Sequence, residues 1–261
     1  MTVVDDAREH IAALRTSHDH LAALVADLDE QQLQAPSYDD EWSIGQVLSH
    51  LGSQSEIFEL FLEAVLDGRP APGGEVFPPI WDVWNAKQPL QWRDDWRAAS
   101  EKHVARFEAL TDEEIERFSM DFFGRTLDLL GFLRMRLSEQ AVHAWDVEVM
   151  GTPTAEVSPT AVPLLVDHLD FVVARTADGS GGPYRVRVGT RHPVRDLVVE
   201  VGDPVVVRTA EPDDSYDGSV DLPAEAFLRL VYGRLDVDRT PEHSESGGRG
   251  LADLRLVFPG V

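Results

Sequence analysis

The chain has 261 residues, with 23 basic against 47 acidic side chains and a formal net charge of −24 at pH 7. So negative a protein repels phosphate groups, which argues against nucleic acid or an anionic membrane as its partner. It contains no cysteine, so disulfides, thiolate zinc fingers and a cysteine nucleophile are excluded. Any thiol chemistry must therefore use a thiol supplied from outside the chain.

The start of the chain is acidic rather than basic, since it holds Asp5, Asp6 and Glu9 beside Arg8, and it has no apolar run of the signal-peptide kind. No stretch approaches the roughly 18 apolar residues of a membrane span. Hydrophobic residues make up 43% of the chain, which is enough for a core. We therefore expect a cytoplasmic protein, folded as two domains of ordinary size.

The N-terminal half has the apolar spacing of helices. A capping box is expected at Ser43, with Gln46 three residues later, and Gly68 is a natural helix end. The segment 68–80 is rich in proline and glycine and is predicted to be a loop, and 118–125 an irregular or extended piece. Four long helices are expected, at residues 5–32, 43–68, 90–110 and 127–150. They indicate a four-helix bundle.

The pattern changes after Gly151, where a linker with two prolines precedes a second kind of composition. We predict an α+β protein of two domains, a bundle at 1–151 and a small α+β domain at 158–261. The second domain is expected to contain helices at 162–173 and 223–232, strands at 184–188, 197–201, 205–208 and 254–258, and a flexible loop at 242–250.

The last helix of the bundle carries a pair of chemically useful residues. Glu139 and His143 stand four residues apart, so both side chains lie on one face. The helix is apolar all round, which indicates burial, and a buried carboxylate needs a partner such as a metal ion or an arginine. His50 on the second helix is also expected to face inward. The three residues would form a His₂Glu set with an open position, as in catalytic zinc sites.

Plainer interpretations stay open from spacing alone. An inward-facing histidine is most often a hydrogen-bonded core residue, and Glu139 could instead form an ion pair with Arg136 or with a lysine elsewhere. Of the other histidines, His18 and His20 are expected in a solvated turn and His103 on a solvated helix face. Four tryptophans are expected to close one end of the bundle; they are Trp81, Trp84, Trp92 and Trp96.

Two motifs far apart in the chain carry a family resemblance. They are Glu41-Trp42-Ser-Ile-Gly-Gln-Val-Leu-Ser-His50-Leu-Gly and Arg136-x-x-Glu139-x-x-x-His143-x-x-Asp146. Together they resemble the mycothiol-dependent maleylpyruvate isomerase family of the DinB-like four-helix metalloproteins. The segment 221–235 is similar to the sterol-carrier-like C-terminal domain found in that family. The resemblance covers nearly the whole chain.

The resemblance implies a set of roles for these residues. It implies that His50, Glu139 and His143 bind a divalent metal ion, usually zinc. It further implies that Arg136 and Asp146 support these ligands from behind. The expected cosubstrate is mycothiol, a low-molecular-weight thiol that would supply the nucleophile this cysteine-free chain lacks.

The expected function is a metal-dependent isomerase or S-transferase that acts on a small electrophile such as an unsaturated diacid. Metal coordination lowers the pKa of a thiol, and the thiolate adds to the double bond. Arg136, Asp146 and Arg234 are expected to assist catalysis, the two arginines by holding substrate carboxylates. The protein is expected to be a monomer or a homodimer.

Two alternatives share the same sequence features. In the first, the metal activates water and the protein is a hydrolase. In the second, the bundle keeps a structural metal and the C-terminal domain binds an apolar ligand or a partner. Three protein ligands favour an enzyme over this binding module, because structural zinc normally has four.

Overall fold

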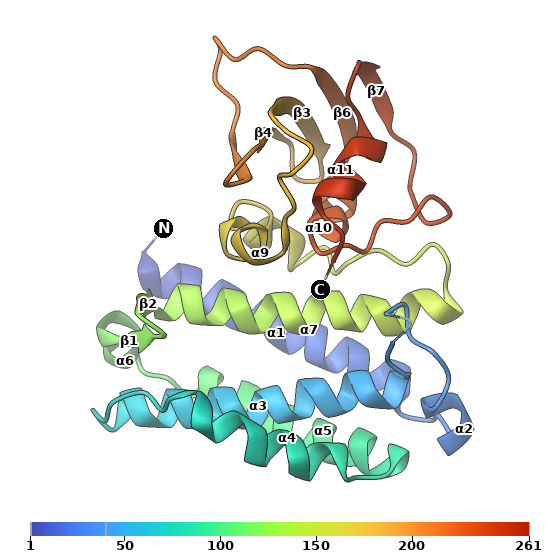
Figure 1. The fold of residues 1–261 in the computed structure, drawn as a ribbon. Helices are drawn as coiled ribbons and strands as arrows, with labels where there is room; N and C mark the ends of the chain where they lie inside the picture. Colours follow the sequence, from blue (N-terminus) through green and yellow to red (C-terminus); the bar gives the residue numbers. More distant parts are fainter. Residues whose placement is uncertain (1, 40, 261) are drawn as a thin grey trace. The chain divides into compact units, whose positions relative to one another are not determined.

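Four long helices build the N-terminal part of the computed structural model, which describes residues 2–39 and 41–260. They are α1 (Val3–Val25), α3 (Ile44–Leu66), α5 (Pro89–Glu108) and α7 (Leu129–Gly151). α1 packs along α7 and α3 along α5, and contacts of α1 with α5 and of α3 with α7 complete the bundle (Figure 1). The predicted four-helix bundle is confirmed.

The start of α3 is fixed by the predicted capping box. The Ser43 hydroxyl accepts from the Gln46 amide at 3.2 Å, and the Gln46 side chain accepts from the Ser43 amide at 2.9 Å. The helix ends at Leu66, and Gly68 follows in the left-handed region at φ +67°, which glycine adopts without strain. α7 begins in a similar way, because the Asp128 carboxylate accepts from the Gly131 amide at 2.8 Å.

The loop predicted at 68–80 is partly helical. It contains a 3₁₀ turn, η1 (Gly74–Val76), and the first residues of α4 (Phe77–Asn85). Pro78 and Pro79 occupy the first turn of α4, where a missing N–H costs no helical hydrogen bond. Pro78 and Pro79 therefore mark the start of a helix, and the prediction that they lie in a loop was wrong.

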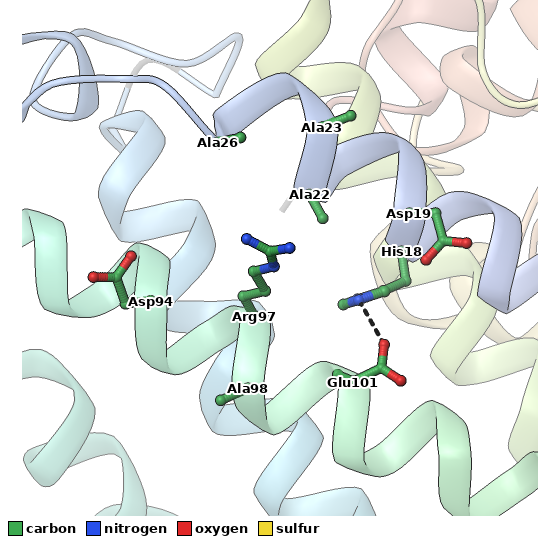
Figure 2. A pocket seen from close by; sticks show the side chains of 9 residues that line it. All are labelled: His18, Asp19, Ala22, Ala23, Ala26, Asp94, Arg97, Ala98 and Glu101. Carbon is green, nitrogen blue, oxygen red and sulfur yellow. Dashed lines mark ion pairs between the residues drawn. The ribbon is translucent and has the colours of Figure 1, made fainter.

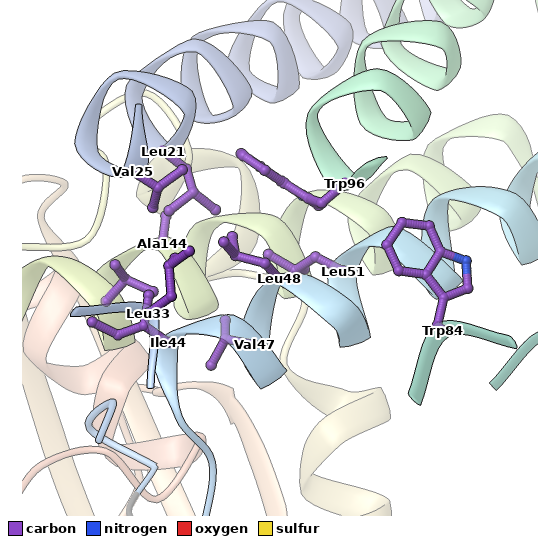
Figure 3. Packing of buried hydrophobic residues seen from close by; sticks show 11 residues of the cluster. Leu21, Val25, Leu33, Ile44, Val47, Leu48, Leu51, Trp84, Trp96 and Ala144 are labelled. Atoms are coloured by element: carbon purple, nitrogen blue, oxygen red, sulfur yellow. The ribbon is translucent and has the colours of Figure 1, made fainter. Parts of the chain in front are cut away.

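One hydrophobic cluster of the bundle core joins α1, α2 (Glu30–Leu33), α3 and α7 with tryptophans of α4 and α5 (Figure 3). Its buried members are Leu21, Val25, Leu33, Ile44, Val47, Leu48, Leu51, Trp84, Trp96, Ala144 and Val147. Burial of each large side chain contributes about 1.5–3 kcal/mol. Trp84 reaches α3 at Gly52, where a Cβ would lie 2.2 Å from the indole. Glycine therefore permits the approach of α4 to the helix that carries His50.

Short elements connect the bundle helices. α1 ends at Val25, earlier than predicted, and the brief α2 (Glu30–Leu33) follows it. Between α5 and α7 lie α6 (Asp112–Arg117) and an antiparallel hairpin in the segment predicted to be irregular or extended. Its strands are β1 (Ser119–Phe122) and β2 (Arg125–Asp128).

The C-terminal part holds a five-stranded sheet in the order β5-β4-β3-β6-β7. The strands are β3 (Tyr184–Arg191), β4 (Arg195–Val201), β5 (Val206–Thr209), β6 (Gly218–Pro223) and β7 (Ser244–Gly247). β3 and β6 run parallel, and the other neighbours are antiparallel. The helices are α8 (Val162–Leu165), α9 (Asp170–Thr176), α10 (Ala224–Val231) and α11 (Leu251–Val257). This mixed sheet after a helical bundle confirms the predicted α+β class.

Three predictions for the C-terminal part were wrong in detail. The helix expected at 162–173 is two short helices, α8 and α9. The strand expected at 254–258 lies mostly in α11, whose buried Leu251, Leu254 and Val257 recur at helical spacing. The flexible loop expected at 242–250 contains the exposed strand β7, which pairs through its backbone and has no apolar side chain to signal it.

By its internal contacts the chain divides into two units, Met1–Ala155 and Glu156–Val261. We call them the bundle unit and the sheet unit. Across the residues that the structure describes, none of the helices combines the length and apolarity needed to cross a membrane.

Candidate metal centre

The side chains of His50, Glu139 and His143 converge between α3 and α7. His50 Nε2 lies 3.0 Å from Glu139 Oε2, and His143 Nε2 lies 3.6 Å from the same oxygen. One ligand atom from each residue lies within 4.8 Å of the others. A tetrahedral zinc ion with bonds of about 2.0–2.2 Å holds its ligand atoms roughly 3.3 Å apart. The separations of the two imidazole nitrogens from Glu139 Oε2 are close to this spacing, so the donor set suits a divalent ion.

One i,i+4 relationship on α7 and the packing of α3 against α7 create this convergence. Glu139 and His143 lie on one face of α7, as the sequence predicts, and α3 brings His50 against them. Asp146 lies a further turn along α7, and its carboxylate accepts from His143 Nδ1 at 2.8 Å. A carboxylate at Nδ1 places the ring proton there and leaves the Nε2 lone pair facing Glu139. The backbone carbonyl of Asp146 also accepts from the amide of Tyr38 at 2.9 Å.

The centre is open on one side. The side chains of His50 and Glu139 are 27% and 34% exposed, whereas that of Asp146 is fully buried. Trp42, just before the start of α3, covers part of the ligand set, with ring centroids 4.8 Å from His50 and 5.8 Å from His143. His50 and Glu139 are thus partly accessible to solvent, whereas the carboxylate that holds His143 is not.

The electrostatics favour the protonation states that metal ligands need. Burial lowers the pKa of His50, so the imidazole is neutral at neutral pH. Burial alone would raise the pKa of Glu139. The hydrogen bonds with His50 and Gln54 more than offset burial, so this pKa lies well below its usual value. A neutral imidazole and an ionised carboxylate are the forms that coordinate a cation.

Arg136 is buried in the bundle close to the site. The alternative that Glu139 pairs with Arg136 is not what the structure shows, because the guanidinium instead donates to Ser55 Oγ at 3.0 Å and to Gln140 Oε1 at 3.1 Å. It also lies 3.4 Å from Gln54 Oε1. Burial lowers the pKa of Arg136 to about 10, so the group stays charged. Gln54 lies between this guanidinium and Glu139.

Arg234 belongs to the sheet unit. It is buried there, and its Nη1 donates to the Tyr232 carbonyl at 2.8 Å. The catalytic assistance expected of Arg234 stays a prediction, as do the substrate-binding role of Arg136 and the supporting role of Asp146.

Two histidines expected to be solvated are buried. His18 is enclosed between α1 and α5, where its Nδ1 lies 2.9 Å from Ser100 Oγ and its ring lies against Trp96. His103 is buried as well, with its Nδ1 3.1 Å from Glu59 Oε2. Both predictions were wrong, because charged neighbours in the sequence hide the buried side of each helix.

A second group of ligand-type residues lies beside a cavity of about 610 Å³ between α1 and α5 (Figure 2). His18, Asp19 and Glu101 offer donor atoms within 4.8 Å of one another. Arg15 already pairs with both acids, at 2.5 Å from Glu101 and 3.4 Å from Asp19. Here a guanidinium supplies the positive charge, so this group lacks the uncompensated carboxylate that a cation would relieve.

Sequence reasoning assigned no role to Gln54 or Trp42 at the ligands. Gln54 Nε2 lies 2.7 Å from Glu139 Oε2 and 2.9 Å from His50 Nε2. A signal existed for Gln54, since it follows His50 by four residues and so shares its helix face. Trp42 gave no comparable signal, because it precedes the helix and its orientation depends on the preceding turn.

Comparison with known proteins adds independent findings. The family model of the mycothiol maleylpyruvate isomerase N-terminal domain matches residues 14–148. Among solved structures, the mycothiol-dependent maleylpyruvate isomerase and a histidine-to-alanine mutant of it are similar to this chain, each with a TM-score of 0.64. For both, the identity is 14%, and the match covers 92% of this chain and 99% of theirs. A Geobacillus thermodenitrificans (strain NG80-2) protein named "Putative metal-dependent hydrolase" is 43% identical over 51 residues, which are 20% of this chain and 29% of that protein.

Fold and site together define a class of protein, an α+β protein whose N-terminal four-helix bundle carries a candidate His–Glu–His metal centre. Within that class, the chain belongs to the mycothiol maleylpyruvate isomerase N-terminal domain family, whose model matches more than half of its length. The predicted family is thereby confirmed, and the solved isomerase structures show the same fold.

Proposed function

We propose that this chain is a zinc-dependent enzyme that uses mycothiol to isomerise, or to conjugate, a small electrophile such as an unsaturated diacid. One observation carries the proposal: donor atoms of His50, Glu139 and His143 meet within 4.8 Å at a partly exposed position. Family membership supports the choice of thiol. The absence of cysteine is consistent with it, because the sulfur nucleophile must then come from a cosubstrate.

The chain's own residues would divide the work between them. His50, Glu139 and His143 would hold the ion, which supplies a Lewis acid that lowers the pKa of a thiol or of water. Asp146 keeps the proton of His143 on Nδ1 and its lone pair turned inward. Trp42 shields one side of the imidazoles from water.

For the substrate, we propose an anion with one or two carboxylates. The buried charge of Arg136 lies behind the ligand set and makes the region more favourable for an anion. We further propose that Arg234 binds a substrate carboxylate, since a guanidinium forms bidentate hydrogen bonds with that group.

A metal-dependent hydrolase is the second candidate function. The name of the Geobacillus protein favours it, although the match covers 29% of that protein. In this case water, rather than a thiol, would be the nucleophile, and the same three ligands would serve. The two functions therefore differ in what takes the open position.

Titration of mycothiol into the cobalt-substituted protein separates the two. A thiol-using enzyme should develop a sulfur-to-cobalt charge-transfer band and release a proton on binding, because the coordinating form is the thiolate. A correctly metallated protein that shows no such band would contradict the thiol proposal and favour the hydrolase. Elemental analysis of the purified protein provides the prior check, and about one divalent ion per chain is expected.

A further inference from the structure

The cavity between α1 and α5 has the size of a small-molecule site. Its volume is about 610 Å³, within the roughly 300–1,000 Å³ that is usual for pockets that hold small ligands. Alanines line it from both helices, Ala22 and Ala26 on α1 and Ala98 on α5 (Figure 2). Such short side chains take up little of the space between the helices, and their methyl groups offer apolar surface to a ligand.

One guanidinium in the cavity is available to a ligand. Figure 2 shows Arg97 extending from α5 toward α1. In the part of the chain that the structure describes, Arg97 has no hydrogen bond or ion pair to another residue. A guanidinium presents five N–H donors and binds carboxylates in bidentate fashion. Arg97 therefore offers a binding position for a carboxylate group from outside the chain.

The three carboxylates that line the cavity, in contrast, each contact a guanidinium already. They are Asp19, Glu101 and Asp94. Arg15 Nη1 lies 3.4 Å from the first and 2.5 Å from the second, and Arg93 Nε lies 2.8 Å from the third. Arg15 also pairs with Glu108, outside the cavity. A bare anion would face these carboxylates, and a bare cation would find that each of them has a partner.

Asp19 is the least engaged of the three carboxylates. Its contact with Arg15 is long, at 3.4 Å, and its side chain is 63% exposed. A carboxylate accepts several hydrogen bonds, so an ammonium group can join Arg15 at the oxygens of Asp19. The cavity thus combines a donor for a carboxylate on α5, at Arg97, with an acceptor for an ammonium group on α1.

We propose that this cavity binds a small zwitterion with an apolar body, of the amino-acid class, with its carboxylate on Arg97 and its ammonium group toward Asp19. The alanines pack against the apolar part. A zwitterion has no net charge, so it avoids the repulsion that a protein of net charge −24 imposes on an anion. The site is independent of the proposed function, because His50, Glu139 and His143 are not among the residues that line the cavity.

His18 provides a reporter inside the cavity. Its buried side chain lines the cavity, with Nε2 3.3 Å from Glu101 Oε2. Titration of L-leucine into the whole chain should shift the His18 ring signals in proton–carbon correlation spectra, and the shift should saturate. Isocaproate is leucine without the ammonium group, and isopentylamine is leucine without the carboxylate. Each should bind at least about 10-fold more weakly, because one charge-assisted hydrogen bond is lost.

Two variants test the contacts with the charged groups. Arg97→Gln and Asp19→Asn should each raise the dissociation constant for L-leucine by about 10-fold. Arg106→Gln is the matched control, since Arg106 lies on α5 as well but does not line the cavity, and it should bind L-leucine as the wild type does. Equal losses in the Arg97→Gln and Arg106→Gln proteins would reveal a general effect of charge and would overturn the proposal.

Ala22→Leu tests the position of the ligand without a change of charge. The longer side chain fills part of the cavity, so binding of L-leucine should be lost while helical circular dichroism stays that of the wild type. If this variant does not fold, Ala98→Leu, at an exposed position on α5, replaces it. The proposal is wrong if the His18 signals of the wild type show no saturable shift, if isocaproate binds as tightly as L-leucine, or if the folded leucine variant keeps wild-type affinity.

Discussion

Two of the histidine–glutamate pairs in the bundle have nearly the same separation but differ in their exposure and in their neighbours. His50 and Glu139 are 3.0 Å apart between α3 and α7, and Glu59 and His103 are 3.1 Å apart between α3 and α5. The first pair is about one-third exposed. The second is almost sealed, with side chains 9% and 1% exposed. We call His50 and Glu139 the open pair, and Glu59 and His103 the sealed pair.

The surroundings of the two pairs explain the difference in their expected roles. His143 adds a third donor to the first pair, and within residues 2–39 and 41–260 no third ligand-type residue joins the second pair at coordinating distance. His103 is instead bordered by the rings of Phe58 and Phe107. Its Nε2 is buried without a hydrogen-bond partner. Donor number and access, rather than residue type, separate a candidate metal centre from a hydrogen-bonded pair in the core.

Removal of ligands should produce the largest effect. His50→Ala, His143→Ala and Glu139→Gln should each weaken Co²⁺ binding by more than the roughly 100-fold typical of an outer partner, because a coordinate bond is lost. His103→Ala, which alters the sealed pair, should leave metal affinity unchanged. Metal titrations with helical circular dichroism as a folding check test both halves. If His103→Ala weakened metal binding as much as the ligand variants do, the proposed difference between the open and the sealed pair would be contradicted.

The second-largest effect is expected from acid, which should lower the free energy of unfolding through the sealed pair. Burial lowers the pKa of His103 to about 4 from the usual 6.5. Below pH 6.5 the unfolded chain therefore takes up a proton that the folded protein refuses, and stability falls until about pH 4. The free energy of unfolding should drop by about 3 kcal/mol across this window through His103.

Denaturant unfolding at a series of pH values measures this loss. His103→Gln should be less stable near neutral pH but should show a flatter dependence between pH 6.5 and pH 4. His20→Gln is the control, since His20 is 47% exposed in its contact with Glu148 and should leave the slope unchanged. Equal slopes in the wild type and the His103→Gln protein would contradict the assignment of the acid sensitivity to the sealed pair.

A smaller effect on metal affinity is expected from a change at Asp146, the hydrogen-bond partner of His143. Asp146→Asn keeps the shape of the side chain but lets it turn an N–H toward His143 Nδ1, which frees the imidazole to change tautomer. Metal affinity should fall about 10- to 100-fold. Glu148→Gln, on the same helix but paired with the exposed His20, should bind metal as the wild type does. A wild-type affinity in the Asp146→Asn protein would show that His143 needs no such support.

The smallest effect is expected at the outer edge of the sealed pair. Lys102 Nζ lies 3.7 Å from Glu59 Oε1, but the lysine side chain is 69% exposed. Solvent screens such a pair, so Lys102→Ala should change the free energy of unfolding by less than about 1 kcal/mol. A larger loss in denaturant titrations would mean that Lys102, rather than the hydrogen bond with His103, is the main stabiliser of the ionised Glu59.

The features that could be predicted from the sequence depend on residues close together in the chain. The i,i+4 relation of Glu139 and His143 and the capping box at Ser43 depend on residues within one or two turns, and the structure contains both. Four helices and an α+β class likewise follow from periodicity and from the change in composition after Gly151. Trp42 and Gln54 contact residues of α7 that lie 82 to 101 positions away in the sequence, so no local sequence pattern predicts these contacts.

The burial of His103 shows why some contacts escape such reasoning. The buried stripe of α5 is Trp96, Ser100, His103, Val104 and Phe107, which has regular helical spacing. Two of its five members are polar, and the flanking residues are charged, so the stripe does not stand out as hydrophobic. Its recognition requires the partners across the bundle, Glu59 for His103 and His18 for Ser100.

Two hydrogen bonds of Asp146 connect the candidate metal centre to the segment before α3, so the local opening of that segment can be measured. The carboxylate of Asp146 holds His143, while its backbone carbonyl holds the amide of Tyr38, in the turn that leads to Trp42. The turn cannot swing away from α7 without breaking the second bond. The rate at which the Tyr38 amide exchanges its hydrogen with deuterium therefore sets an upper limit on how often this wall of the centre opens.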